Sequence, residues 1–105
     1  MQESSAPFGK VQNLESNDKF GSSVLIVEVG QEITKHYHKK TKEIEVILEG
    51  EIICDGEIQR PGEVNIWEPM QMHGYKNISN APVKILCLAV PPYDPNDSFE
   101  VGPTA

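Results

Sequence analysis

Three histidines and one glutamate are the side chains of this sequence whose types and spacing best fit metal chemistry. His36 and His38 are two residues apart, so in an extended strand both side chains leave the same face and can converge on one ion. Glu43 opens the run EIEVILEG, which is typical of a second strand that returns its carboxylate to the same point. His73 could supply a fourth ligand. Such donors are costly to desolvate without an ion, so His36, His38, Glu43 and His73 predict a site for one divalent metal ion.

A second carboxylate, Glu45, follows Glu43 by one strand step, and strand alternation turns it to the same inward face. We expect burial and the nearby Glu43 to raise its pKa, which makes Glu45 the candidate proton shuttle. A solvated or lysine-paired glutamate at the mouth of the fold is the alternative. Tyr75 shares a face with His73 and is the next candidate for catalysis, unless it is an ordinary half-buried core tyrosine. The predicted catalytic residues are therefore Glu45 and Tyr75.

The segments that must position these side chains have the pattern of short strands. Strands are expected at 22–29, 33–38, 43–49, 63–67, 73–78 and 83–90, and Asp55-Gly56 is expected to form a hairpin turn between two more. No stretch of eleven or more residues shows helical periodicity, which favours an all-β sandwich or barrel. We divide the chain into an N-terminal arm at 1–20 with a short candidate edge strand, a β-barrel at 21–92 and an irregular C-terminal tail at 93–105.

An apolar stripe is predicted on the outside of this barrel. Ile44, Val46 and Leu48 alternate with Glu43 and Glu45 and so face the opposite way. Contiguous apolar patches on small monomers usually mark an interface, so either the N-terminal arm or a second subunit must cover the stripe. A homodimer is the prediction that follows.

Composition narrows the class of partner. A chain of 105 residues makes one domain, and nine Lys and Arg against sixteen Asp and Glu give it a net charge of −7. This charge disfavours nucleic acid and anionic membranes and leaves a small molecule as the expected ligand. Cys54 and Cys87 lie in apolar strand-like runs, and the sequence shows neither a hydrophobic signal segment nor a run long enough to cross a bilayer. We therefore expect a reduced, cytoplasmic protein.

Two spacings in the chain resemble the two cupin motifs. The first motif, G-x5-H-x-H-x4-E-x6-G, is matched at every position, by Gly30, His36, His38, Glu43 and Gly50. The second, G-x5-P-x-G-x2-H-x3-N, is matched at three positions, by Gly62, His73 and Asn77. Two positions depart from it, because Glu68 stands where the proline is expected and Met70 replaces the second glycine. We expect these departures to alter the turn before His73.

The resemblance is to small single-domain cupins of the type-2, mannose-6-phosphate-isomerase-like kind. It implies a double-stranded β-helix or jelly-roll barrel, a three-His one-Glu site for Mn, Fe, Ni, Co or Zn, and frequent dimerisation. The function that it implies is a mononuclear metalloenzyme for a small oxygenated metabolite such as a sugar acid, keto acid or dicarboxylate. Isomerisation, lyase or decarboxylase chemistry and Fe-dependent dioxygenase chemistry all remain open, and a non-catalytic binding or sensing cupin is the alternative.

Overall fold

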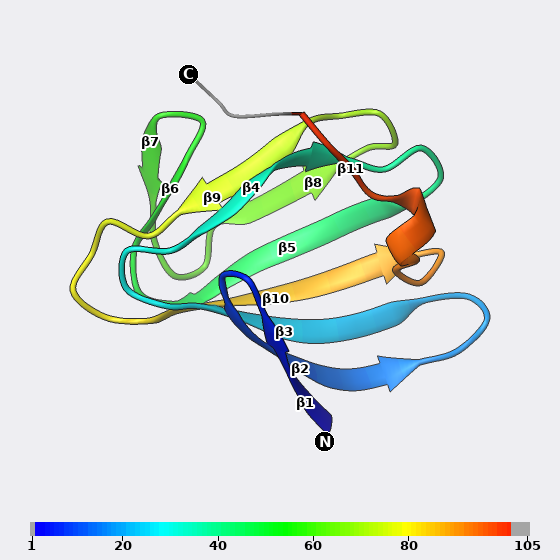
Figure 1. The fold of residues 1–105 in the computed structure, drawn as a ribbon, viewed down its shortest axis with the longest axis horizontal. Helices are drawn as coiled ribbons and strands as arrows, with labels where there is room; N and C mark the ends of the chain where they lie inside the picture. The colour runs from blue at the N-terminus through cyan, green and yellow to red at the C-terminus, as the bar shows by residue number, and fades with distance from the viewer. Residues whose placement is uncertain (1, 102–105) are drawn as a thin grey trace.

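The structure is a computed structural model that describes residues 2–101, and it consists of two antiparallel β-sheets that face each other as an open barrel (Figure 1). The larger sheet has six strands in the order β1 (Gln2–Ala6), β2 (Gly9–Ser16), β3 (Gly21–Val27), β10 (Val83–Val90), β5 (Lys42–Glu49) and β8 (Val64–Trp67). The smaller has five, in the order β11 (Phe99–Glu100), β4 (Glu32–Tyr37), β9 (His73–Lys76), β6 (Ile52–Cys54) and β7 (Glu57–Gln59). The predicted all-β jelly-roll fold is confirmed.

Strand alternation places the core between the sheets. Along β5 the residues Glu43, Glu45 and Ile47 are buried, while those between them are not, so the predicted inward face is confirmed. The strand β10 pairs with β3 on one side and with β5 on the other. A central position of this kind is expected for a strand whose sequence is apolar on both faces. Val27 and Ile85, which are both fully buried, join Ile47 in the core. The hydrophobic core therefore lies on the same face of β5 as the inward-facing glutamates.

The expected hairpin turn at Asp55-Gly56 is also present. The backbone φ angles are 51° at Asp55 and 79° at Gly56, so both central residues are left-handed, as a two-residue type I′ turn requires. The turn joins β6 to β7 with Cys54 opposite Glu57.

The N-terminal arm at 1–20 is more ordered than the one short edge strand that the sequence predicted. Its residues form the hairpin of β1 and β2, and β2 pairs with β3, so the arm extends the larger sheet. The candidate edge strand at Val11 to Leu14 lies within β2, but the edge itself is β1. Most side chains of β1 are exposed, so hydrophobic periodicity could not reveal a strand that is held mainly by backbone hydrogen bonds. Met1 lies outside the described residues.

The C-terminal tail predicted to be irregular at 93–105 is partly ordered. A short 3-10 helix spans Pro95–Asp97, and β11 then pairs with β4. The remainder of the tail, 102–105, lies outside the described residues. Within residues 2–101, no helix has the length and apolar character that a membrane span needs.

The apolar stripe on β5 continues onto the neighbouring strand β8. Ile44 pairs with Ile66 and Val46 pairs with Val64, so these side chains share the outer face of the larger sheet. Ile66 is 52% exposed and Val64 is 55% exposed, and the N-terminal hairpin joins the far side of the sheet beyond β10. The hairpin therefore does not cover the stripe, which leaves a second subunit as its expected cover.

We expect Val46→Lys to convert a homodimer into monomer or aggregate, because a two-fold contact would bury the new charge twice. Light scattering coupled to size exclusion measures this change. Ile58→Lys, on an exposed position of the smaller sheet, serves as the charge-matched control and should leave the dimer intact. A wild-type monomer, or an unchanged dimer of Val46→Lys, would contradict the prediction.

Candidate metal centre

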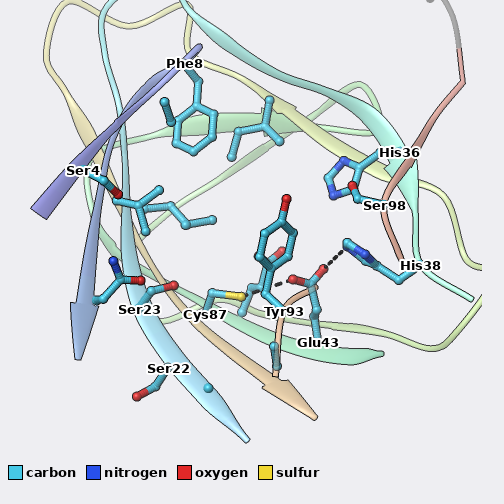
Figure 2. Close-up of a pocket in the computed structure, with 18 of the residues that line it drawn as sticks. Ser4, Phe8, Ser22, Ser23, His36, His38, Glu43, Cys87, Tyr93 and Ser98 are labelled. Carbon is cyan, nitrogen blue, oxygen red and sulfur yellow. Dashed lines mark hydrogen bonds and ion pairs between the residues drawn. The ribbon is translucent and has the colours of Figure 1, made fainter. Parts of the chain in front are cut away.

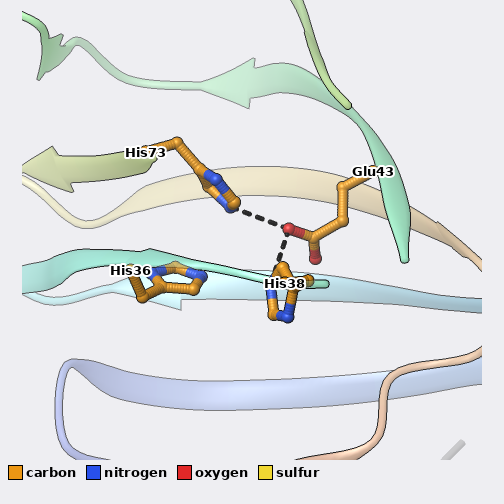
Figure 3. A group of neighbouring side chains, drawn as sticks. All are labelled: His36, His38, Glu43 and His73. Atoms are coloured by element: carbon orange, nitrogen blue, oxygen red, sulfur yellow. Dashed lines mark hydrogen bonds and ion pairs between the residues drawn. The ribbon is translucent and has the colours of Figure 1, made fainter. Parts of the chain in front are cut away.

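The four predicted ligands come from both sheets, and their side chains gather at one place (Figure 3). His36 lies on β4 and is directly opposite His73 on β9, while His38 follows the end of β4 and Glu43 comes from β5 of the other sheet. One donor atom from each residue lies within 4.8 Å of the other three. The structure thus brings together all four residues that the sequence predicted.

A β-bulge in β4 sets the position of His36. The register with β9 shifts between Ile33, which is opposite Tyr75, and His36, which is opposite His73. Bulges re-aim side chains and often occur beside functional sites. The bulge also brings β4 close to Gly74, where a Cβ atom would lie 2.7 Å from the Ile33 carbonyl oxygen. Glycine is therefore needed between His73 and Tyr75 for the two strands to approach.

Backbone carbonyls orient all three imidazole rings. Nδ1 lies 2.8 Å from the Thr34 oxygen in His36, 2.7 Å from the Asp97 oxygen in His38, and 3.2 Å from the Gln71 oxygen in His73. A neutral ring that donates its Nδ1–H to a carbonyl has an unprotonated Nε2. This is the common arrangement of metal-ligating histidines, because the second hydrogen bond fixes the tautomer and the ring.

The site fits a divalent cation. Nε2 of His73 lies 2.7 Å and Nε2 of His38 lies 3.1 Å from the same Glu43 oxygen, Oε1. Two nitrogen lone pairs and a carboxylate oxygen at these distances repel one another unless positive charge lies between them. His38 Nε2 is also buried without a hydrogen-bond partner. Three imidazoles with one carboxylate suit first-row transition ions and zinc better than calcium or magnesium.

The electrostatics keep Glu43 in the form that binds metal. Burial would raise its pKa, but the neighbouring His38 and His73 rings outweigh burial and hold the pKa of Glu43 well below its usual value. Burial lowers the pKa of His36. Burial would also lower the pKa of His38, yet Glu43 and Asp97 raise it overall. Glu43 is therefore an anion at neutral pH, and protons compete more strongly for His38 than for His36.

Asp97 from the C-terminal tail holds His38, and sequence reasoning missed it. Its backbone oxygen accepts the His38 bond, and its carboxylate accepts hydrogen bonds from the backbone N–H groups of Lys39 at 3.0 Å and Lys40 at 3.1 Å. These bonds lower the pKa of Asp97, although burial opposes them. The Asp-Pro pair at 94–95 does signal a helix start, but nothing in the sequence indicates that this turn reaches a residue 59 positions away.

Glu45 lies behind Glu43 in a buried hydrogen-bond network. Its Oε1 accepts hydrogen bonds from Trp67 Nε1 at 2.8 Å and from the Tyr75 hydroxyl at 2.9 Å. Burial and the Glu43 charge raise the pKa of Glu45, and burial together with Glu45 raises the pKa of Tyr75. Trp67, which the sequence did not single out, also stacks on the His73 ring with centroids 4.9 Å apart. The network thus supports one ligand and holds the second carboxylate.

A cavity of about 780 Å³ opens in front of the site (Figure 2). All four proposed ligands line it, as do Glu45 and Tyr75, so both predicted catalytic residues face the space that a ligand would occupy. Figure 2 shows His36 and His38 on one side of the cavity and Ser4, Phe8 and Ser23 on the other. The volume is in the range of small-molecule sites.

The chain matches the family model described as "Cupin domain" over residues 23–89. It is 34% identical over 90 residues to an uncharacterized protein of Methanocaldococcus jannaschii, a match that covers 82% of this chain and 72% of the relative. No activity is stated in that relative's description.

Solved structures share the fold at low sequence identity. They include a sugar phosphate isomerase from Silicibacter pomeroyi (TM-score 0.71, 21% identity, 77% of this chain), of which the chain spans 58%. KdgF from Halomonas sp. has a TM-score of 0.72 at 18% identity, with 81% of this chain and 80% of that one covered. The polyketide cyclase RemF from Streptomyces resistomycificus has a TM-score of 0.77 at 19% identity, with 90% and 72% covered.

We expect about one divalent ion per chain at neutral pH, and we expect its loss as the pH falls from about 7 to about 5, because protonated imidazole cannot ligate. Because the pKa of His38 is raised, protons begin to compete with the metal for this ring above the ordinary histidine pKa of 6.5.

His73→Ala should weaken metal binding by more than the tenfold to hundredfold that is typical of losing a residue hydrogen-bonded to a ligand. Elemental analysis measures both effects. Met72→Ala, at an exposed neighbour, is the control, and a stoichiometric ion in His73→Ala would remove His73 from the set.

Asp97→Ala should lower metal affinity by about tenfold to a hundredfold, although it leaves all four donors in place, because the loop that carries His38 loses its anchor. Competition with a chromophoric chelator measures the affinity. Asp97→Asn, which retains an acceptor oxygen, should lie closer to wild type. Histidine 15N spectra of metal-free Asp97→Ala should show that His38 no longer has one fixed tautomer. Unchanged affinity and an unchanged His38 tautomer would show that the tail does not position this ring.

Proposed function

The chain belongs to the cupin family, and from this membership and the geometry of its site we propose that it is a mononuclear metalloenzyme for a small oxygenated metabolite. The observation that carries the proposal is the convergence of two imidazole Nε2 atoms on one Glu43 oxygen, with the Nδ1 of each ring hydrogen-bonded to a backbone carbonyl. His36, His38, Glu43 and His73 would hold the ion. A bound Mn, Fe, Ni, Co or Zn ion would supply Lewis-acid stabilisation of negative charge on a ligand oxygen.

The network behind the site supports Glu45 rather than Tyr75 as the group that moves a proton. The Tyr75 hydroxyl donates its hydrogen bond to Glu45, and its oxygen accepts one from Asn65 at 2.9 Å. Its single proton is therefore already used within the network. In Glu45, Oε1 accepts the hydrogen bonds from Trp67 and Tyr75, which leaves Oε2 for a proton that could pass to or from a ligand in the cavity. Tyr75 is then a positioning residue for Glu45.

The fold alone does not determine the reaction. The related folds include one protein described as a sugar phosphate isomerase and another described as a polyketide cyclase, so this barrel accompanies different chemistries. Isomerisation, lyase or decarboxylase chemistry and Fe-dependent dioxygenase chemistry remain compatible with the four ligands. A binding or sensing role without turnover is the second candidate, and the same ligand set and cavity would serve it.

We expect Glu45→Gln to keep wild-type metal content while turnover falls by about a hundredfold or more, the usual scale of general acid-base contributions. Glutamine keeps the shape and the acceptor oxygen for Trp67 and Tyr75 but cannot take up a proton. The assay is a panel of keto acids and sugar acids followed by chromatography and oxygen uptake, with metal content measured on the same samples.

Each other outcome has a distinct meaning. Oxygen uptake that survives in Glu45→Gln would favour Fe-dependent dioxygenase chemistry in which Glu45 is incidental. Ligand binding without any turnover in wild type would favour the binding or sensing role. Loss of metal from Glu45→Gln would contradict the shuttle and make Glu45 a support of Glu43. Tyr75→Phe is the matched control, because it removes one donor to Glu45 and no carboxylate.

A further inference from the structure

Among the described residues, the carboxylates that line the cavity have no basic side chain beside them other than histidine. The charged side chains that line it are glutamates, namely Glu15, Glu32 and Glu100, which are exposed at its rim, and Glu43 and Glu45 on its floor. None of the described residues that line it is lysine or arginine. The three histidines are the remaining titratable nitrogens of the lining, and they belong to the metal site. Away from that site, the described lining therefore offers no cationic partner to a negatively charged group.

Part of the cavity wall is uncharged and apolar. Phe8, Leu25 and Ile33 line the cavity and pack against the hydrophobic core, and Ser23 adds a hydroxyl group. Figure 2 shows Ser23 and Phe8 across the cavity from the two labelled histidines. A ligand that reaches this wall from the metal site would place there a carbon skeleton or hydroxyl groups. A carboxylate or phosphate in the same place would lose its hydration without a compensating charge.

The ligand set imposes the same limit. A divalent ion held by three neutral imidazoles and the Glu43 carboxylate has a net charge of about +1, which one negative charge on the ligand neutralises. A second negative charge would remain uncompensated in a cavity whose rim carries Glu15, Glu32 and Glu100. Repulsion from these carboxylates and the lack of a compensating cation both disfavour that second charge.

We propose that the ligand of this site has one chelating oxygen group with at most a single negative charge, and an uncharged, partly apolar remainder that lies against Phe8, Leu25 and Ile33. The proposal rests on the proposed metal-dependent function. It narrows the substrate class to monoanionic keto or hydroxy acids and neutral hydroxylated molecules, and it removes dicarboxylates and phosphate esters.

The test compares probes with the same chelating group on metal-loaded protein by isothermal titration calorimetry. 4-Methyl-2-oxopentanoate has an apolar tail, 2-oxoglutarate has a second carboxylate in its place, and 3-phosphonopyruvate has a phosphonate. We expect the first to bind at least about tenfold more tightly than either of the other two. Equal or tighter binding of 2-oxoglutarate or 3-phosphonopyruvate would overturn the proposal, and so would a failure of all three probes to bind.

A designed cation tests the same idea in reverse. Ser23 pairs with Cys87 on β10, and Cys87 pairs with Glu45, so position 23 lies across two strands from the site. Ser23→Arg should therefore raise the affinity for 2-oxoglutarate by about tenfold or more relative to the oxopentanoate, whereas the uncharged Ser23→Gln should not. Asn13→Arg, an exposed position paired with Ser23, is the second variant if Ser23→Arg does not fold. An unchanged preference in a folded arginine variant would overturn the proposal.

Metal analysis of the same samples separates this inference from the proposed function. Wild-type protein that takes up no divalent ion would overturn the metal site itself. Protein that holds its ion but prefers a dianion would overturn only the proposed ligand class.

Discussion

The approach of His38 and His73 Nε2 to one buried oxygen of Glu43 is the constraint on which the site depends. Glu43 belongs to the larger sheet, whereas His73 and the opposing His36 belong to the smaller one. A cation between these atoms would therefore also tie the two sheets together. The Nδ1 bonds to backbone carbonyls make the arrangement directional, because a ring that turned to relieve the repulsion would lose its own hydrogen bond.

Local patterns predicted the parts of the fold that have one buried face. The alternation of Glu43, Glu45 and Ile47 with apolar neighbours identified the inward face of β5, and the spacing of His36 and His38 identified a shared face near it. Strand β1 was missed because its side chains are largely exposed, and β11 was missed because its two residues are too few to show a period. The contact of Asp97 with His38 was out of reach for another reason, since it joins distant segments and uses a backbone oxygen that has no signature in the sequence.

Met70 shows how a departure from the family motif is accommodated. It replaces a glycine of the second motif, and we expected the turn before His73 to change. Instead Met70 has a φ of 74°, the left-handed conformation that a glycine would adopt at little cost. Its N–H donates to the His38 carbonyl oxygen at 2.6 Å, so the turn supports the loop that carries a ligand. The conformation costs about 1 kcal/mol or more in a residue with a Cβ atom, and the site retains it.

Glu43 and Glu45 leave the same face of one strand, yet their surroundings drive them toward opposite protonation states. Imidazole nitrogens face Glu43 and hold its pKa low, whereas Glu45 is enclosed behind it and the charge of Glu43 raises its pKa. Cys87 lies beside the pair and donates its thiol to Glu43 Oε2 at 3.3 Å, so it adds no charge of its own. Pairs of carboxylates whose pKa values are driven apart are a recurrent basis for dividing roles between two acids. Here the imidazole nitrogens favour the charge on Glu43 that a cation requires, whereas burial beside Glu43 disfavours a charge on Glu45.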